Sequence, residues 1–349
     1  MNGLMAYSAI KTKISVMKGN LITKAQFAEI ANLSNMSEMV AYLSKHPGYG
    51  FLLSDLDFRY VNRSALEELL VYSPCADFNK IYSFGRLEQK KFVDIHYLYF
   101  QIRFIKRAIR KLYNNYPIQT EVSNMEKLFA GHEKFDIRLV AQSTDIPDLI
   151  SNLKGSIFYE PLKGIKDVTN LKLFDYELAL DLFYFKTLWK LRSSFGRADK
   201  EILAKMYGKQ IDMLNIMWVY RFKKYYSVLP KDLNNYLIPV HYKLHDDYLE
   251  KLVNSDDISS FYSVLNETYY GRFFNIVDQE TFEYAYRKVM TDMHRSEYKK
   301  NPYSLMAIIN YLYLKDEEVK KLITIAECIR YKYSPDKIIS TLETIGGAG

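Results

Sequence analysis

A short amphipathic segment that recurs three times constrains the fold more than any other feature of this sequence. One copy has its apolar residues at Ile258, Phe261, Tyr262 and Leu265. The spacing i, i+3, i+4, i+7 places these side chains on one face of an α-helix. Asp256 and Asp257 precede this copy, where carboxylates cap free N–H groups, and Tyr270-Gly271 ends it. The pattern predicts a capped helix that ends at an aromatic residue.

The same arrangement occurs twice more. Thr144-Asp145 precedes a second copy, which ends at Tyr159 and has its apolar residues at Ile146, Leu149, Ile150 and Leu153. Ser34-Asn35 precedes a third, which ends at Tyr49-Gly50 and has its apolar residues at Met36, Met39, Val40 and Leu43. The tyrosine lies thirteen residues after the first apolar position in two copies (36 to 49, 146 to 159) and twelve in the other (258 to 270). We interpret these segments as three divergent copies of one helical module.

An Asp-to-Arg step of nine residues precedes two of the copies, at Asp212 to Arg221 and at Asp94 to Arg103. Nine residues at about 100° each place the two ends on opposite sides of a helix, so each must face a different neighbour. Asn215 lies one turn after Asp212 and is suited to share its partner. Module-to-module ion pairs and capping are the favoured interpretation; a catalytic role would require these groups to converge in a cleft.

Composition favours an all-α fold. The chain has 349 residues, of which 48% are hydrophobic, enough for a sizeable core. Only 14 glycines and 9 prolines interrupt it, few for a protein that needs a tight turn every dozen residues. We therefore expect three helical modules over residues 1–80, 81–197 and 198–300, followed by C-terminal helices and a tail over 301–349.

Two expected helices bear on later arguments. A helix over 87–113 carries a basic stripe of Arg103, Arg107 and Arg110, a candidate interaction face whose alternative is a solvated surface. A helix over 64–72 should end at Ser73-Pro74, because the residue before proline is disfavoured in the helical conformation.

Net charge, cysteine content and the apolar runs of the sequence limit the classes of partner and the compartment that we expect. The net charge of +7 is spread along the chain, which favours an acidic protein or an anionic membrane surface over nucleic acid. Two cysteines, Cys75 and Cys328, suggest a reducing compartment. The longest apolar run, residues 305–314, is too short to cross a bilayer, and no secretory signal is evident. These features predict a cytoplasmic protein, at most peripheral to a membrane.

No pattern for catalysis, a metal or a cofactor stands out. His241 and His245 are spaced i, i+4, but no third ligand accompanies them. Neither a phosphate loop nor a Gly-x-Ser-x-Gly motif occurs. Aromatic residues next to basic ones are better explained as contacts between helices than as a platform for nucleic-acid bases. We expect no enzyme, no cofactor, no small-molecule substrate and no nucleic acid.

Three stretches resemble one family, which comprises the C subunit of archaeal and bacterial V-type (A-type) ATPases and its eukaryotic counterpart, the d subunit of the vacuolar enzyme. They are Asp212-Met-Leu-Asn-Ile to Arg221, Glu177-Leu-Ala-Leu-Asp181-Leu-Phe-Tyr184-Phe185, and Pro302-Tyr-Ser-Leu-Met-Ala-Ile-Ile-Asn-Tyr311-Leu-Tyr-Leu-Lys315-Asp-Glu-Glu318 to Ile325. The resemblance covers nearly the whole chain. It departs from the family at His96-Tyr97, where Asn-Leu is usual, and in the first module, whose long helix lacks the Asp-to-Arg step.

The resemblance implies a non-catalytic central-stalk subunit, monomeric when isolated. Its three modules would form a pseudo-threefold funnel on the cytoplasmic face of the membrane rotor ring, with the shaft of the D and F subunits in its central cavity. Such a subunit transmits torque between ATP chemistry and ion transport. A generic helical repeat scaffold for protein–protein interaction is the alternative.

Partner contacts are expected at the ends of the amphipathic segments and along the basic stripe. The candidate residues are Tyr49, Gly50, Arg103, Arg107, Arg110, Tyr159, Tyr270 and Gly271. Helix capping and a solvated surface are the alternatives for each of them.

Overall fold

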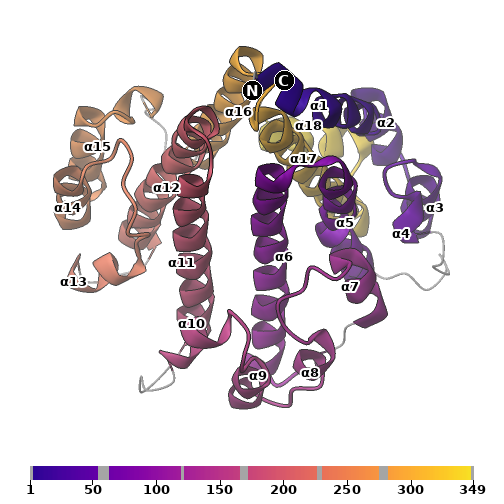
Figure 1. The fold of residues 1–349 in the computed structure, drawn as a ribbon, viewed down its shortest axis with the longest axis horizontal. Coiled ribbons are helices and arrows are strands. Elements are labelled where there is room, and N and C mark those ends of the chain that lie inside the picture. The colour runs from indigo at the N-terminus through magenta and orange to yellow at the C-terminus, as the bar shows by residue number, and fades with distance from the viewer. Residues whose placement is uncertain are drawn as a thin grey trace. The chain divides into compact units, whose positions relative to one another are not determined.

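A computed structural model describes residues 3–53, 63–118, 122–165, 172–225, 230–274 and 282–346. Every regular element in those ranges is a helix, which confirms the all-α expectation (Figure 1). Two compact units emerge, one of residues 1–86 with 286–349 and one of residues 87–285. The finer division into four sections, and their funnel arrangement, stay predictions.

The first unit combines the two ends of the chain. Helix α16 (Phe282–Lys300) leads into it from the second unit. Its other helices are α1 (Gly3–Gly19), α2 (Lys24–Ala31), α3 (Met36–Lys45), α4 (Gly50–Leu53), α5 (Arg63–Phe84), α17 (Met306–Arg330) and α18 (Pro335–Gly346). Both α2 and α3 pack on α17, so an N-terminal helix pair rests on a C-terminal helix.

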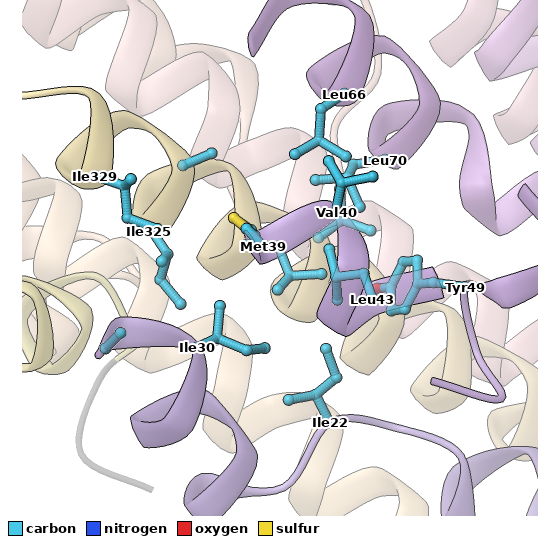
Figure 2. Packing of buried hydrophobic residues seen from close by; sticks show 14 of the residues in the cluster. Ile22, Ile30, Met39, Val40, Leu43, Tyr49, Leu66, Leu70, Ile325 and Ile329 are labelled. Carbon is cyan, nitrogen blue, oxygen red and sulfur yellow. The ribbon is translucent and has the colours of Figure 1, made fainter. Parts of the chain in front are cut away.

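The core of the first unit forms around the predicted apolar face of α3. Met39, Val40 and Leu43 are fully buried (Figure 2). Around them lie side chains from α2, α5 and α17, including Ile30, Leu66, Leu70, Ile325 and Ile329. Burying each side chain of this size stabilises the fold by about 1.5–3 kcal/mol, so this face fixes α3 on its neighbours.

Helix α5 does not end at Ser73-Pro74, so that expectation was wrong. It continues through Pro74 to Phe84. Proline lacks the N–H that would bind the carbonyl of Leu70, four residues earlier. The hydroxyl of Ser73 donates to that carbonyl at 2.8 Å and supplies the missing partner. Ser73, half of the expected stop signal, thus helps the helix to continue.

The second unit contains three long helices and two helix pairs. Its long helices are α6 (Leu87–Tyr113), α11 (Leu173–Leu191) and α12 (Arg197–Tyr225). Its shorter helices are α7 (Val122–Phe129), α8 (Ile137–Ala141), α9 (Ile146–Asn152), α10 (Tyr159–Lys163), α13 (Pro230–Leu233), α14 (Asp246–Asn254) and α15 (Ile258–Glu267). Short 3₁₀ turns cover Arg192–Ser194, Asn234–Tyr236 and Gly271–Phe273.

Two ion pairs show the relative direction of helices α6 and α11. Lys106 of α6 pairs with Asp181 of α11 at 2.8 Å, and one turn further along α6 Arg110 pairs with Glu177. Because the later residue of α6 meets the earlier residue of α11, the two helices are antiparallel. Helix α12 returns alongside α11 after the short turn at Arg192–Ser194, so α6 and α12 run in the same direction (Figure 1).

Within the part of the chain that the structure describes, no helix is both long and apolar enough to cross a membrane.

Candidate functional site

Three helix pairs, α2–α3, α8–α9 and α14–α15, are built alike and contain the three predicted segments as their second helices. The caps Asn35, Asp145 and Asp257 all have extended backbones, with φ/ψ of −155°/169°, −147°/176° and −142°/179°. Their side chains accept from the N–H of Glu38, Asp148 and Ser260 at 3.0, 2.8 and 2.7 Å. All three predicted caps are confirmed.

The apolar face of each second helix is also confirmed. Its last position, Leu43, Leu153 or Leu265, is fully buried in every pair. Each pair packs on one long helix: the first on α17, the second on α6 and the third on α12. The repeated unit is therefore a capped helix pair resting on a long helix.

A buried aromatic ring follows each pair. In the second pair it is not Tyr159, the residue predicted from its spacing after Ile146. Tyr49, Phe158 and Tyr270 are all fully buried, whereas Tyr159 is half-buried. The counterpart of Tyr49 and Tyr270 is therefore Phe158, and the choice of Tyr159 was wrong. Spacing alone could not separate two adjacent aromatic residues, because burial decides between them.

The glycines after the first and third rings allow a close approach of two backbone segments. A Cβ on Gly50 would lie 2.7 Å from the carbonyl oxygen of Ser44. One on Gly271 would lie 2.5 Å from the Cα of Asn266. Real side chains do not fit at such distances, so both turns require glycine. In the second pair Tyr159 occupies the place after the ring.

The third pair is held by two buried side chains of α12. The carboxylate of Asp212 accepts from the backbone N–H of Tyr242, Lys243 and Leu244 at 3.0, 2.6 and 2.9 Å. It also accepts from the hydroxyl of Tyr270 at 2.7 Å. Asp212 thus binds both the segment that enters the pair and the ring that follows it. We use the term anchor for a polar side chain of a long helix that holds such an entering segment.

Asn215 completes the third anchor, but it does not share a partner with Asp212, so that expectation was wrong. Its amide donates to the carbonyl of Ile238 and accepts from the N–H of the same residue, both at 2.9 Å. Arg221 is exposed and takes no part in these contacts, consistent with its half-turn offset from Asp212.

Burial and hydrogen bonding act in opposite directions on Asp212. Loss of water raises the pKa of its carboxyl, and the donors that surround the oxygens counteract that rise. Burial, with the neighbouring carboxylate, raises the pKa of Tyr270 far above its usual range. The tyrosine therefore stays a neutral donor to Asp212.

The anchor of the first pair is Glu318, which lies on α17. One carboxylate oxygen accepts from the N–H of Ile22 at 2.5 Å, and the other from the hydroxyl of Tyr49 at 2.6 Å. Glu318 therefore repeats the dual role of Asp212, although it follows its helix pair in sequence. The Asp-to-Arg step that precedes the other two pairs does not occur at Glu318, which lies after its pair, so that pattern does not point to it. Lys315 and Glu318 are spaced i, i+3, but the neighbouring charges Asp316, Glu317, Lys320 and Lys321 give no sign in the sequence that this pair is the buried one.

Buried charges surround Glu318. Lys315, 2% exposed, donates to its carboxylate at 2.7 Å and lies 3.9 Å from the centre of the Tyr49 ring. Next to this group, the hydroxyl of Tyr311 donates to Asp77 at 2.7 Å. The carboxylate and the aromatic face next to this ammonium group offset part of the cost of burying its charge.

The second pair uses a neutral anchor. The amide of Gln101 on α6 donates to the carbonyl of His132 and accepts from the N–H of Lys134, both at 2.9 Å. Tyr97 stacks on the His132 ring, with centroids 4.4 Å apart. Asp94, the counterpart of Asp212 by sequence, is not buried; its carboxylate lies 3.4 Å from the His132 ring nitrogen. Phe158 has no hydroxyl and packs edge-on against Phe135, with ring centroids 5.6 Å apart.

The basic stripe of α6 is partly neutralised within the second unit. Arg110 makes a two-point contact with Glu177, its Nη2 donating at 3.0 Å, and its side chain remains 54% exposed. Arg103 lies over the rings of Tyr99 and Phe100. Arg103 and Arg107 are half-buried. Partner contact along this stripe stays a prediction.

The remaining candidates of the sequence analysis do not converge. His241 lies 3.1 Å from Asp246, and over the described residues no group of three metal-ligating side chains occurs. Cys75 and Cys328 are both buried and unpaired with each other. The anchors are occupied by the protein's own backbone, so their chemistry is that of attachment.

Comparisons with known proteins identify the family of this chain. Residues 10–340 match the family model described as ATP synthase (C/AC39) subunit. The C subunit of the A-type ATP synthase of Pyrococcus abyssi is 24% identical, over 95% of this chain and 89% of the relative. Its counterpart in Methanobrevibacter smithii is 25% identical over 95% and 86%, and that in Archaeoglobus fulgidus is 24% identical over 91% and 90%.

The family is that of a structural subunit with no catalytic centre of its own, which confirms the expectation that this chain is not an enzyme. The match includes all three helix pairs and all three anchors. The chain belongs to the ATP synthase (C/AC39) subunit family and is a subunit of a rotary ATPase.

Proposed function

We propose that this chain is the central-stalk subunit that links a shaft of the D and F subunits to a membrane rotor ring. In that place it transmits torque between ATP hydrolysis or synthesis and ion transport, on the cytoplasmic face of the membrane. The relatives, named as C subunits of A-type ATP synthases, support this role.

The observation that carries the proposal is the way each helix pair is locked to its long helix. A subunit that passes torque must resist deformation. Asp212, Glu318 and Gln101 each bind backbone groups of the segment entering a pair. Buried polar networks that are fully satisfied make a structure rigid. Three such anchors in one chain suit a mechanical adapter.

The proposed contact residues fall into two groups. Tyr49, Tyr270 and Gly271 lie inside the protein and Gly50 is half-buried, so they would serve a partner by shaping the ends of the pairs. Tyr159 and the stripe residues Arg103, Arg107 and Arg110 have accessible surface and would touch it. A basic stripe favours an acidic partner surface.

Co-purification with native mass spectrometry tests the role. The tagged chain is mixed with the D–F shaft and, separately, with the detergent-solubilised ring. We expect one copy of the chain in each complex. A chain that captures neither partner at low salt would favour the generic scaffold.

The contact residues need a matched pair of variants. Reversing charge with Arg103→Glu and Arg107→Glu should abolish capture of one partner, whereas Lys154→Glu, an exposed site in the turn after the second pair, should not. Circular dichroism checks that both variants fold. Equal capture by both variants would remove the stripe from the interface.

A further inference from the structure

Exposed tyrosines gather at the ends of the three long helices that carry the anchors. Over the described residues, the tyrosines with large exposed surface are Tyr113, Tyr116, Tyr225, Tyr303, Tyr331 and Tyr333. All but Tyr303 lie at the C-terminal end of α6, α12 or α17. Core packing does not explain this clustering, since 44–62% of each of these five side chains is exposed.

The ends of α6 and α12 combine these rings with lysines. At the end of α6, Lys111 lies 5.8 Å from the ring centre of Tyr116, which is 62% exposed. At the end of α12, Lys224 lies 5.2 Å from the ring centre of Tyr225, also 62% exposed. Because α6 and α12 run in the same direction, both groups lie at the same end of the second unit.

The end of α17 presents the same chemistry in the first unit. Every residue from Arg330 to Lys337 is exposed. Arg330 lies over the ring of Tyr331, and the rings of Tyr331 and Tyr333 are 6.1 Å apart. Asp336 is the one acidic residue of this exposed turn, against three basic ones.

The turn after α17 contains a residue in an unfavourable backbone conformation. Lys332 has φ of 56°, its N–H donates to the carbonyl of Ile329, and the N–H of Tyr333 donates to that of Cys328. This is the Schellman ending, in which glycine is preferred at the left-handed position. Asn115 occupies that position after α6, also followed by an exposed tyrosine. A lysine there gives up backbone stability, which points to a use for its side chain.

Basic residues at helix C-termini have an ordinary explanation, because they offset the helix dipole. Lys223 illustrates it: its ammonium group donates to the carbonyls of Val253 and Ser255. That explanation covers neither the exposed rings nor the lysine at the left-handed position.

We propose that the ends of α6 and α12 in the second unit, residues 110–116 and 223–225, and, independently, the end of α17 in the first unit, residues 330–337, bind the anionic headgroups of a phospholipid membrane. Tyrosine suits the membrane–water interface, where its ring is buried and its hydroxyl remains hydrated. Lysine and arginine next to it are attracted to anionic lipid. The inference goes beyond the proposed role, because it needs neither the shaft nor the ring.

A lipid surface fits these ends better than an acidic protein does. The ends share a composition, cations with exposed phenols, and Tyr116 and Tyr333 lie at the same place three residues past their helices, but the other rings differ, since Tyr113 and Tyr225 are the last residues of α6 and α12 whereas Tyr331 follows α17. A protein partner recognises a defined arrangement of groups, whereas a membrane surface responds to charge and amphipathic character.

Vesicle co-sedimentation of the full chain tests the proposal. The probes are vesicles of phosphatidylcholine alone and vesicles that also contain phosphatidylglycerol. We expect sedimentation only with phosphatidylglycerol, weakening as salt is raised. Equal binding to both vesicles, or to neither, would overturn the proposal. So would displacement by inorganic phosphate beyond that by chloride of equal ionic strength, since it would indicate a site for free phosphate.

Substitutions at the ends provide the matched comparison. Replacing Tyr116, Tyr225 and Tyr333 by serine should weaken binding several-fold, while Tyr303→Ser, an exposed tyrosine elsewhere, should leave it unchanged. Lys332→Gly should weaken binding on the order of fivefold. The same substitution should raise the midpoint of thermal unfolding, because glycine relieves the left-handed residue.

Opposite effects of Lys332→Gly on binding and on stability would separate a lipid contact from a structural role. A variant that is more stable yet binds vesicles as well as the parent would refute the use of Lys332. Capture of the D–F shaft by the same variants stays as in the parent, so failure of this proposal leaves the central-stalk role untouched.

Discussion

The second and third helix pairs, both in the second unit, solve one problem with different chemistry. In the third pair a buried carboxylate, Asp212, collects three backbone N–H groups and the hydroxyl of Tyr270. In the second pair a neutral amide, Gln101, makes two hydrogen bonds, and the ring that follows is Phe158. The charged anchor and the hydroxyl occur together, and the neutral anchor goes with a ring that has no hydroxyl.

This difference indicates that the type of aromatic residue is matched to the type of anchor, with tyrosine beside a carboxylate and phenylalanine beside an amide. The first pair supports the point, since Glu318 binds both Ile22 and the hydroxyl of Tyr49. A buried carboxylate needs donors on every side, so the tyrosine completes its set. The amide of Gln101 carries no charge and already donates and accepts one hydrogen bond, so the ring beside it does not have to supply a hydroxyl. The comparison predicts that the third pair depends on its anchor more than the second does.

The largest expected effect comes from removing the anchors. Asp212→Ala leaves four donors without their acceptor and should lower the free energy of unfolding by about 3–5 kcal/mol. Gln101→Ala removes two hydrogen bonds and should cost about 1–3 kcal/mol. Urea unfolding of both variants measures the difference. Equal losses of unfolding free energy would contradict the prediction that the third pair depends on its anchor more than the second does.

The sequence singles out the residues of the third anchor, although as an ion pair rather than as an acceptor of backbone N–H groups, and it does not single out those of the other two. Asp212 and Asn215 lie one turn apart on the helix before their pair, so local spacing places both on the same side of that helix, although they bind different residues of the entering segment. Gln101 lies a turn beyond the position that alignment with Asn215 indicates, and its partners are 31 and 33 residues away. Glu318 is separated from Ile22 by 296 residues, and only the folded chain brings them together.

The fold itself was more accessible from the sequence. Caps and apolar spacing act within one or two turns, so the pattern predicts Asn35, Asp145 and Asp257 correctly. Burial at an adjacent position is a tertiary property, which is why spacing points to Tyr159 rather than to Phe158. The continuation of α5 past Pro74 is accompanied by a side-chain hydrogen bond from Ser73 to the carbonyl of Leu70, which helix propensities do not include.

The next effect concerns the glycine after the ring. Gly271→Ala places a methyl group 2.5 Å from the Cα of Asn266 and should destabilise by about 1–3 kcal/mol, since backbone must move. Tyr159→Ala, at the same place after the second ring, removes a half-buried side chain and creates no clash. Thermal unfolding of the two variants distinguishes them. A Gly271→Ala protein as stable as the parent would show that this turn can shift freely.

Exchanging the aromatic residues at positions 158 and 270 tests whether each ring is matched to its anchor. Tyr270→Phe removes one donor from Asp212 and should cost about 1 kcal/mol. Phe158→Tyr places a hydroxyl among Phe135 and its neighbours and should also destabilise, because the new group lacks a partner there. Denaturant midpoints give both values. Stabilisation by Phe158→Tyr would mean that the second pair holds an acceptor for the hydroxyl.

The smallest effect is the difference in pH dependence between the charged anchor Asp212 and the neutral anchor Gln101. Burial raises the pKa of this carboxyl above its ordinary 3.8, so the native protein keeps the proton to higher pH than the unfolded chain does. The stability that protonation contributes is complete below 3.8 and is lost as the pH rises through the native pKa. The parent should therefore lose stability relative to Asp212→Asn across that range.

Gln101→Leu is the control, because an amide does not titrate and its stability difference from the parent should not change with pH. Unfolding curves of the three proteins at several pH values between about 3 and 7 give the comparison, since Asp residues titrate at the acid end of this range. A parent that instead gains stability relative to Asp212→Asn as the pH rises would mean that hydrogen bonds from the donors around the carboxylate outweigh its loss of water. The contribution of Asp212 to stability would then be largest at neutral pH, whereas the contribution of Gln101 would be the same at every pH.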